Sequence, residues 1–346
     1  MVRAACVGLG NLGRMELALL DAMDGVTVVA GADPSPAVRQ RTASEHDVAT
    51  YADHDALLTA EAPDLVSIAS PHTLHYEQAR AALDAGVHVH LEKPMVTRLA
   101  DARDLIDRAT AAGLTLAVGY QRHFDPRFRE LRRLIDEGRI GEPHMAACHL
   151  EQLWIGANHD GWRGDPALSG GGQLYDSGSH LLDALLWTTR STPTAVSAEI
   201  DRRGYDVDVN AALSVRLVRR GGEGSDDTPA PDASRLTASV GVTGAGRTAP
   251  DTGEALHVWG TAGAVSFDGR RVRVTEAGGE PGASYESEPA DPGFEALTRR
   301  KLANFVAAIR DEAELEIPAT DALKVTALTE AAYESAERGE RVEIDV

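Results

Sequence analysis

The chain has 346 residues, of which 54 are acidic and 34 are lysine or arginine, giving a formal net charge of −20. At about 150 residues per domain this length predicts two domains. A composition with 43% hydrophobic and 25% charged residues excludes wholesale disorder. The sequence offers no apolar run of about 18 residues for a membrane span, and its acidity disfavours nucleic acid and anionic membranes as partners.

Lysine is rare in this chain. Lys93, Lys301 and Lys324 are the lysines, and every other one of the 34 basic residues is arginine. Acidic, lysine-poor chains resemble those of salt-in halophiles, where salt screens the repulsion between carboxylates. A GC-rich genome explains the arginine but not the net charge, so we expect a halophilic source. The two cysteines, Cys6 and Cys148, are too few for a disulfide framework or a cysteine-rich zinc site and favour the cytoplasm.

The first 120 residues alternate short apolar runs with amphipathic stretches. Strands buried on both faces that alternate with helices predict a parallel, doubly wound α/β sheet. The expected strands are Val2–Val7, Val26–Ala32, Leu65–Ala69, Val87–Leu91 and Leu114–Val118, and the expected helices are Leu12–Met23, Tyr76–Ala85 and Ala100–Ala112.

Beyond Tyr120 the apolar residues recur with a period of two, which predicts an antiparallel sheet with one wetter face. Polar and glycine-rich residues at Arg219–Ala233 predict a surface loop. The expected strands are Ala211–Leu217, Leu236–Val242 and Val342–Ile344, and the expected helices are Pro126–Glu137, Phe294–Arg310 and Ala319–Arg338.

A glycine-rich turn, Gly8–Gly13, follows the first expected strand and opens the first helix. Its G-x-G-x-x-G pattern suits a tight turn whose backbone approaches a pyrophosphate at a helix N-terminus. Asp33 ends the second strand about 20 residues later, where a carboxylate binds the adenosine ribose hydroxyls. The pattern therefore predicts a dinucleotide site formed by Gly8, Gly10, Asn11, Leu12, Gly13 and Asp33.

The carboxylate of Asp33 would repel a 2′-phosphate, which favours NAD over NADP. Arg39 and Arg41 lie nearby in sequence and keep NADP open as an alternative, since an arginine accommodates that phosphate. Asp33 could instead cap a helix. Ser35 and Pro36 already supply an N-cap and a first-turn proline, so Asp33 is available for the ribose.

The tripeptide Glu92-Lys93-Pro94 follows the apolar run Val87–Leu91, at the strand end where doubly wound folds bind ligands. Lys93 is the single lysine in the first 300 residues. Arginine cannot release its proton, whereas burial and neighbouring charge tune a lysine, so Lys93 is a candidate catalytic residue. The alternative is a surface lysine retained by chance.

A second cluster begins with Gly170-Gly171-Gly172 and continues with Asp176, His180 and Asp183 at i, i+4 and i+7. If residues 178–187 are helical, these three side chains share one face. A carboxylate one turn from a histidine fixes its tautomer, as a general base requires. The spacing also suits a metal, but hydride transfer to nicotinamide needs none. We therefore expect no metal, and Asp183 as a capping or salt-bridging residue.

Together these motifs resemble the glucose–fructose oxidoreductase/inositol dehydrogenase (Gfo/Idh/MocA) family, and the resemblance extends over essentially the whole chain. Other segments are similar to the family's T-P-N-x-x-H, G-[FY]-N-R and I-G-[ED]-[PI] motifs and to its C-terminal helices. These are Ser70-Pro71-His72 with His75, Gly119-Tyr120-Gln121-Arg122, Ile140-Gly141-Glu142-Pro143, and Asn304-Phe305 with Ala331–Ala336. His72 stands where asparagine is usual. His90 and His123 are not family features and are expected behind the site or on the surface.

The resemblance implies a Rossmann dinucleotide-binding domain at 1–121 and an α/β domain at 122–346, with residues 219–233 as a surface loop in the latter. The second domain's open, mainly antiparallel sheet would carry substrate and form a homodimer or homotetramer. Carried over from the family, Lys93 touches the nicotinamide ribose and the substrate hydroxyl, Asp176 binds or orients, and His180 is the acid/base. The implied cofactor contacts also include Ser70, Pro71, His72, His75, Glu92 and Gln121.

Arg122 and the pair Trp162-Arg163 are the expected substrate wall, because an aromatic face suits a sugar ring and guanidinium groups bind hydroxyls or a carboxylate. Trp162 could equally be a core aromatic. The resemblance implies an NAD(P)-dependent oxidoreductase acting on a secondary alcohol or carbonyl of a sugar or polyol. The alternatives are an NAD-assisted glycoside hydrolase and a non-catalytic NAD-binding regulator.

Overall fold

The structure is a computed structural model that describes residues 1–219, 234–247, 253–278 and 285–346. The chain forms two compact units, one from Met1–Gln121 with Gly293–Leu323 and the other from Arg122–Pro292 with Lys324–Val346. All but the first residue of the expected loop Arg219–Ala233 lie outside the described residues.

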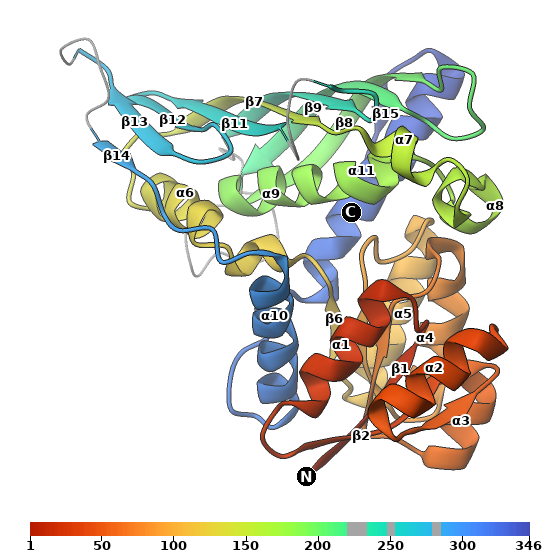
Figure 1. Cartoon of the computed structure of the whole chain (residues 1–346). Helices are drawn as coiled ribbons and strands as arrows, with labels where there is room; N and C mark the ends of the chain where they lie inside the picture. Colours follow the sequence, from red (N-terminus) through yellow and green to blue (C-terminus); the bar gives the residue numbers. More distant parts are fainter. Residues whose placement is uncertain (220–233, 248–252, 279–284) are drawn as a thin grey trace. The chain divides into compact units, whose positions relative to one another are not determined.

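The first unit is built on a six-stranded sheet with the order β3-β2-β1-β4-β5-β6 (Figure 1). Every strand pair in it is parallel. The order reverses between β1 and β4, and doubly wound folds bind ligands at the carboxyl ends of the strands beside such a reversal. The strands are β1 (Val2–Val7), β2 (Val26–Ala32), β3 (Ala49–Tyr51), β4 (Leu65–Ile68), β5 (His88–Leu91) and β6 (Leu116–Val118).

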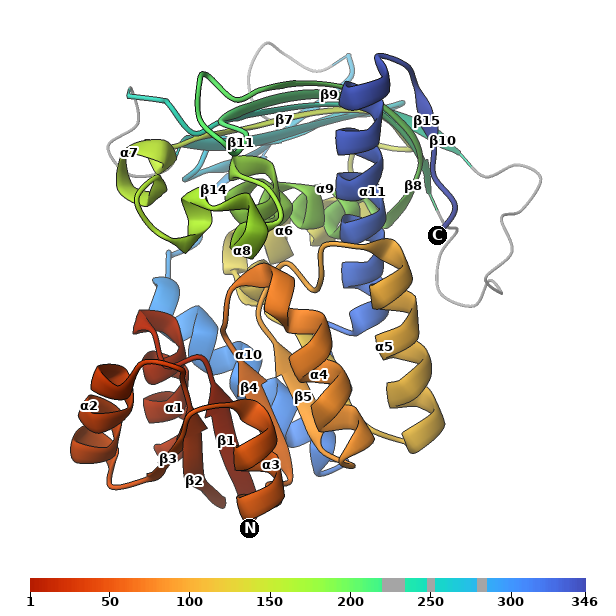
Figure 2. The same ribbon diagram turned by 90° about the vertical axis from the view of Figure 1, so that its right-hand side faces the viewer.

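Helices cover both faces of this sheet, with α1 and α10 on one face and α4 and α5 on the other (Figures 1 and 2). Helix α2 starts where the sequence predicts, because the Ser35 side chain accepts from Val38 N at 3.4 Å and Pro36 occupies the first turn. The helices are α1 (Asn11–Asp21), α2 (Pro36–His46), α3 (His54–Glu61), α4 (His75–Asp84), α5 (Leu99–Ala112) and α10 (Phe294–Ile309), with 3₁₀ turns η1 (His72–Leu74) and η2 (Gln121–Phe124), the latter ending in the second unit.

Residues 293–323 cluster with the first unit, whereas the sequence analysis placed them in the second domain. Leu302 and Phe305 of α10 pack in one buried cluster with Leu17 and Leu20 of α1. Periodicity predicts that this segment is an amphipathic helix. It does not tell which core the apolar face joins, because that partner is distant in sequence.

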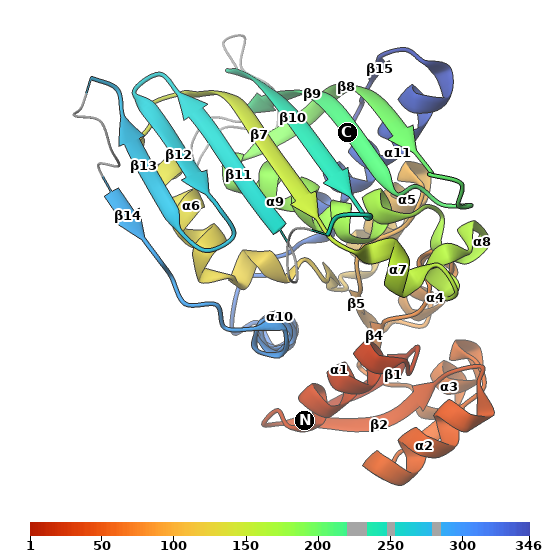
Figure 3. The same ribbon diagram turned by 45° about the horizontal axis from the view of Figure 1, so that its top comes forward.

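The second unit contains a nine-stranded sheet with the order β14-β13-β12-β11-β7-β10-β9-β8-β15 (Figure 3). The pair β10 and β7 is parallel and the other pairs are antiparallel, which confirms the predicted, mainly antiparallel α/β architecture. The strands are β7 (Pro143–Glu151), β8 (Ser191–Asp201), β9 (Asn210–Arg219), β10 (Arg235–Thr243), β11 (Gly253–Gly260), β12 (Gly263–Phe267), β13 (Val272–Glu276), β14 (Tyr285–Ser287) and β15 (Val342–Glu343).

One face of this sheet is covered by α6, α9 and the second-unit part of α11 (Figures 1 and 2). On β9 the predicted alternation holds, with Leu213, Val215 and Leu217 buried and Ser214 and Arg216 exposed. The helices of this unit are α6 (Pro126–Asp136), α7 (Trp154–Asn158), α8 (Pro166–Ser169) and α9 (Ser179–Thr189), with a 3₁₀ turn η3 (Trp162–Gly164) and a π-turn η4 (Leu174–Gly178); α11 (Ala319–Arg338) contributes to both units.

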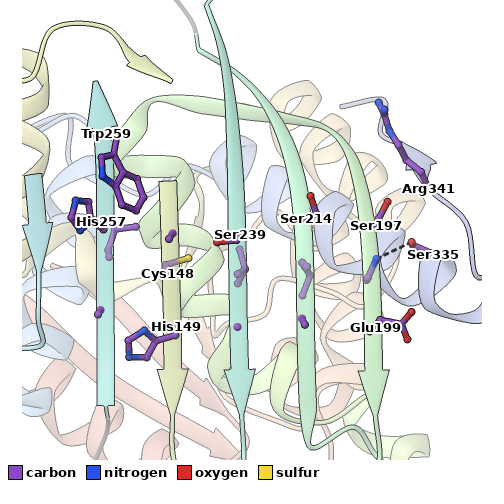
Figure 4. Close-up of a pocket in the computed structure, with 18 of the residues that line it drawn as sticks. Cys148, His149, Ser197, Glu199, Ser214, Ser239, His257, Trp259, Ser335 and Arg341 are labelled. Atoms are coloured by element: carbon purple, nitrogen blue, oxygen red, sulfur yellow. Dashed lines mark hydrogen bonds between the residues drawn. The ribbon is translucent and has the colours of Figure 1, made fainter. Parts of the chain in front are cut away.

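The opposite face of the sheet carries a hollow of about 1020 Å³ (Figure 4). Small side chains such as Ser214 and Ser239 line its middle, and His257 stacks on Trp259 at a centroid distance of 3.9 Å. Across the described ranges, the helices are too short or too polar to cross a membrane.

Candidate functional site

The glycine turn between β1 and α1 has two glycines that the protein's own packing requires. Gly8 adopts φ +84°, and a Cβ there would lie 2.8 Å from the Ala69 carbonyl. A Cβ on Gly13 would lie 1.8 Å from the Gly8 oxygen. These glycines let the turn and α1 pack tightly against the end of β4.

Gly10 is different, because a Cβ at this position would have no protein atom within 4 Å. Gly10 is also the N-cap of α1, and no side chain caps the helix there. The first backbone N–H groups of α1 can therefore bind an anion, and the space beside Gly10 suits a phosphate approaching the backbone. The turn thus fits the pyrophosphate of a dinucleotide.

A Gly10→Ala variant tests this fit. We expect stability within about 0.5 kcal/mol of the parent, since the new methyl group meets no protein atom. NADH affinity should fall about tenfold, because the methyl group blocks the approach of the phosphate. Fluorescence titration with NADH measures the affinity, and Gly13→Ala serves as a contrast that should also lose stability. Unchanged NADH affinity in Gly10→Ala would contradict the expected site.

Asp33 lies at the carboxyl end of β2 and holds the glycine turn in place. Its Oδ2 accepts a hydrogen bond from Leu9 N at 3.0 Å and its Oδ1 accepts from Ser35 N at 2.9 Å. Arg39 donates to the Asp33 backbone carbonyl at 2.8 Å, whereas Arg41 is paired with Glu45 at 2.8 Å. Of the two arginines, Arg39 is the one held beside Asp33.

The segment after β4 is tied to the Glu92-Lys93-Pro94 turn by His75. The buried His75 ring places Nδ1 2.9 Å from the Pro94 carbonyl and Nε2 3.0 Å from the Ser70 carbonyl. Burial lowers the pKa of His75, against the raising effect of these carbonyls. His72 meets the His75 ring edge-on at 5.9 Å, directly after Pro71.

Lys93 follows β5 as predicted and is half-buried, with a cis peptide bond to Pro94. Glu92 is buried, and its Oε2 accepts from Lys93 N at 3.2 Å. Gln121, just after β6, is also buried and donates its backbone N–H to the Gly119 carbonyl at 3.0 Å. The strand ends of the first unit thus carry the expected cofactor residues Asp33, Ser70, Pro71, His72, His75, Glu92, Lys93 and Gln121.

In the second unit Asp176 lies in the π-turn η4 and is firmly held. Its Oδ2 accepts from Trp154 Nε1 at 2.7 Å and from Arg163 Nε at 2.9 Å. The Arg163 guanidinium lies 4.4 Å from the centroid of the Trp162 ring. Trp162 is half-exposed, so it is not a core aromatic, whereas Trp154 is buried. No local sequence pattern marks Trp154 as a partner of Asp176, so this residue was not among the predicted site residues.

His180 is half-buried in the first turn of α9. Asp183 is paired with His123, whose Nε2 lies 3.1 Å from Asp183 Oδ1 and whose ring stacks on Trp187 at 4.4 Å. Asp183 is therefore a pairing residue as expected, and the buried His123 is not on the surface. The π-turn changes the helical period before His180, so the i, i+4 rule does not apply across it.

Asp208 caps the start of the helical segment that carries Asp176 and His180. Its buried carboxylate accepts from Gly172 N, from Leu174 N at 2.8 Å and from the Tyr333 hydroxyl. A Cβ on Gly172 would lie 2.0 Å from the Asp208 carbonyl oxygen, so this turn requires glycine. No local sequence pattern marks Asp208 for this role, because its partners lie 34 to 125 residues away.

Arg122 was expected to line the substrate. Its guanidinium donates to Glu254 Oε2 at 2.7 Å and lies 5.4 Å from the centroid of the Phe128 ring. Burial raises the pKa of Glu254, and the charge of Arg122 opposes that rise. Arg122 therefore acts first as the counter-ion of a buried carboxylate.

Two family models match the chain. Residues 2–120 match the oxidoreductase family with an NAD-binding Rossmann fold, and residues 128–266 match the GFO/IDH/MocA C-terminal domain. These matches correspond to the six-stranded parallel sheet and to much of the nine-stranded sheet.

Curated relatives and solved structures agree with this result. The chain is 34% identical over 279 residues to a putative UDP-kanosamine synthase oxidoreductase subunit of Amycolatopsis mediterranei, covering 77% of this chain and 75% of the relative. It is 30% identical to D-glucoside 3-dehydrogenase of Escherichia coli, over 54% of this chain and 53% of that protein. A levoglucosan dehydrogenase complexed with NADH and levoglucosan has the same fold, with a TM-score of 0.82, 19% identity and 100% coverage of both chains. The chain therefore belongs to the Gfo/Idh/MocA family of NAD(P)-dependent oxidoreductases and contains an NAD-binding Rossmann domain.

Proposed function

We propose that this protein is a dehydrogenase that oxidises a secondary alcohol of a sugar, polyol or sugar derivative, or reduces the corresponding carbonyl. The observation that carries the proposal is Lys93. Lys93 is the single lysine among the first 300 residues, and it stands at the carboxyl end of β5, in the same unit as the glycine turn. An amine there can donate a hydrogen bond to a reacting oxygen and stabilise its developing negative charge.

In this proposal His180 removes the proton of the substrate hydroxyl, and Lys93 hydrogen-bonds the same oxygen. An imidazole with an ordinary pKa of about 6.5 exchanges protons readily near neutral pH. Asp176, fixed by Trp154 and Arg163, orients the substrate, and Trp162 offers its half-exposed ring to a sugar face. When bound, the nicotinamide supplies the hydride acceptor.

We propose NAD as the cofactor, held by the glycine turn and by Asp33. NADP stays the alternative because Arg39 lies against the Asp33 backbone, where it could meet a 2′-phosphate. The names of the relatives support a hexose derivative as the substrate, since one is a D-glucoside 3-dehydrogenase and another a putative UDP-kanosamine synthase subunit.

The test is nicotinamide absorbance with the purified protein, in low salt and in multimolar KCl. NAD and NADP are each screened with glucosides, nucleotide sugars, inositols and sugar acids, with Lys93→Ala as the control. A signal from one substrate group that Lys93→Ala loses supports the dehydrogenase and identifies the cofactor. Sugar release without a net absorbance change would overturn the proposal in favour of an NAD-assisted glycoside hydrolase, and NAD binding without any turnover would favour a regulator.

We propose that the acidic surface is an adaptation to high salt in the cytoplasm of a halophile. Screening of a net charge of −20 should stabilise the fold, whereas exposed pairs such as Arg133 with Glu137 contribute little. We expect the melting temperature to rise by about 5 °C or more between 0.1 and 2 M KCl. Calorimetry measures the change, and a melting temperature that falls with KCl would contradict the adaptation.

We also propose that the open face of the nine-stranded sheet pairs with a second copy of the chain, giving a homodimer or homotetramer. Its centre carries small side chains, including Ser214 and Ser239, which allow close approach of another sheet (Figure 4). We expect Ser239→Arg to yield monomers, with its large charged side chain at the centre of this face. Light scattering after size exclusion measures the mass, and an unchanged oligomer in Ser239→Arg would contradict this surface.

A further inference from the structure

A buried group of charged and polar side chains lies beneath the Glu92-Lys93-Pro94 turn in the first unit. The Lys301 ammonium lies 2.9 Å from Glu16 Oε1 and contacts Glu92 Oε1. Ser67 Oγ donates to Glu16 Oε2 at 2.6 Å and lies 2.8 Å from His90 Nδ1. All five residues are at most 5% exposed, so each charge must be matched by a partner.

The group joins two segments that serve the cofactor. Glu16 is on α1, the helix that the glycine turn opens, and Lys301 is on α10, which lies beside α1 (Figure 1). One carboxylate oxygen of Glu92 pairs with the Lys301 ammonium, and the other accepts a hydrogen bond from the backbone N–H of Lys93. Lys301 therefore connects α1 to the residue that precedes Lys93.

The pocket suits an ammonium rather than a guanidinium or a metal ion. A Cβ on Gly119 would lie 2.5 Å from Glu92 Oε1, so little space surrounds this carboxylate, and an ammonium is compact. Ligand atoms of Glu16, His90 and Glu92 lie within 4.8 Å of one another, close enough for a cation, but Lys301 already supplies the positive charge there. The chain has three lysines, and Lys301, like Lys93, stands at a position where an arginine would not serve the same purpose.

Burial and neighbouring charges together set the pKa values of Lys301 and His90 in this group. Burial alone would lower the pKa of Lys301, but the carboxylates of Glu16 and Glu92 outweigh it and raise the pKa. Burial, aided by the charge of Lys301, lowers the pKa of His90 to about 3, so this ring is neutral near pH 7. The Lys301 ammonium thus lies against the carboxyl groups of Glu16 and Glu92, and Glu92 is the residue that precedes Lys93.

We propose that Lys301 is a positioning residue for the dehydrogenase reaction: it fixes the Glu92 carboxylate against the Lys93 backbone and sets the charge that the Lys93 amine experiences. This inference rests on the proposed function for its catalytic meaning. In the first unit, the titratable and charged groups that contact this turn or the buried group include Cys6 on β1, Glu16 on α1, His90 and Glu92 on and after β5, Lys301 on α10, and His72 and His75 before and at the start of α4.

The test uses the fact that the chain has three lysines. Protein labelled with [ε-¹³C]lysine gives three side-chain signals, and Lys93→Arg and Lys324→Arg identify them. We expect the titration midpoint of Lys93 to rise by about 0.5 unit or more in Lys301→Met, because a positive charge is removed, and to fall by a similar amount in Glu16→Gln, because a negative charge is removed. Structural damage alone would not produce shifts of opposite sign.

A midpoint that stays constant in folded variants, or that moves in the same direction in both, overturns the inference. If Lys301→Met does not fold, Glu16→Gln alone decides by the sign of its shift. The measurement needs neither NAD nor a sugar, so it is independent of the proposed function. Where the dehydrogenase activity is found, Lys301→Met should lower kcat about tenfold and leave the sugar KM within about twofold of the parental value. The limb of the pH–rate profile that reports Lys93 should shift in the same direction as its NMR titration midpoint.

Discussion

The His180→Ala variant is expected to lose about 10²- to 10⁴-fold in turnover and still to bind NADH, because positioned proton transfer contributes this much to rate. His180 is in the second unit, whereas the glycine turn that fits the dinucleotide is in the first. Loss of the imidazole should therefore act on the chemical step. Single-turnover measurement of nicotinamide absorbance isolates that step, and added imidazole should restore part of the rate.

The matched control is His144→Ala, which makes the same change at an exposed histidine on β7. It should keep the parental turnover and the parental melting temperature. Near-normal turnover in His180→Ala would contradict the assignment of His180 as the acid/base and leave Lys93 as the candidate for both proton transfer and charge stabilisation.

The Asp208→Ala variant is expected to be destabilised by about 2–4 kcal/mol, since each buried donor left without an acceptor costs about 1–3 kcal/mol. The donors concerned are Gly172 N, Leu174 N and the Tyr333 hydroxyl. Two of them belong to the turn that begins the segment carrying Asp176 and His180. Turnover should therefore fall together with stability, as measured by urea unfolding and by the absorbance assay.

Asp206→Ala is the control, because Asp206 is exposed, lies two residues away and carries the same charge as Asp208. It should change stability by less than about 0.5 kcal/mol. Asp208→Asn retains one carbonyl acceptor, so its free energy of unfolding should lie between those of Asp208→Ala and Asp206→Ala. Equal stability of Asp208→Ala and Asp206→Ala would show that Asp208 does not hold this helix start.

The fold class could be predicted from the sequence because the patterns that indicate strands, helices and turns involve only neighbouring residues. The apolar run Val26–Ala32 is a strand over the expected residues, and Ala319–Arg338 is a helix over the expected residues. The G-x-G-x-x-G turn and Ser35-Pro36 specify backbone geometry within a few residues, so the turn and the start of α2 form where expected. The motifs also identified the family. The roles of Lys93, Asp176 and His180 stay predictions that the variants above test.

Only the tertiary structure decided which distant residues become partners. Periodicity predicts that α10 is an amphipathic helix. Its apolar face packs against α1, which lies at the opposite end of the unit's sequence, so no local pattern could predict that contact. Lys301 and Glu92 are 209 residues apart, and Tyr333 and Asp208 are 125 apart. A local pattern specifies an element and its buried face, because both depend on neighbouring residues. It cannot specify which charge meets which in the interior, because that depends on how all the elements pack together.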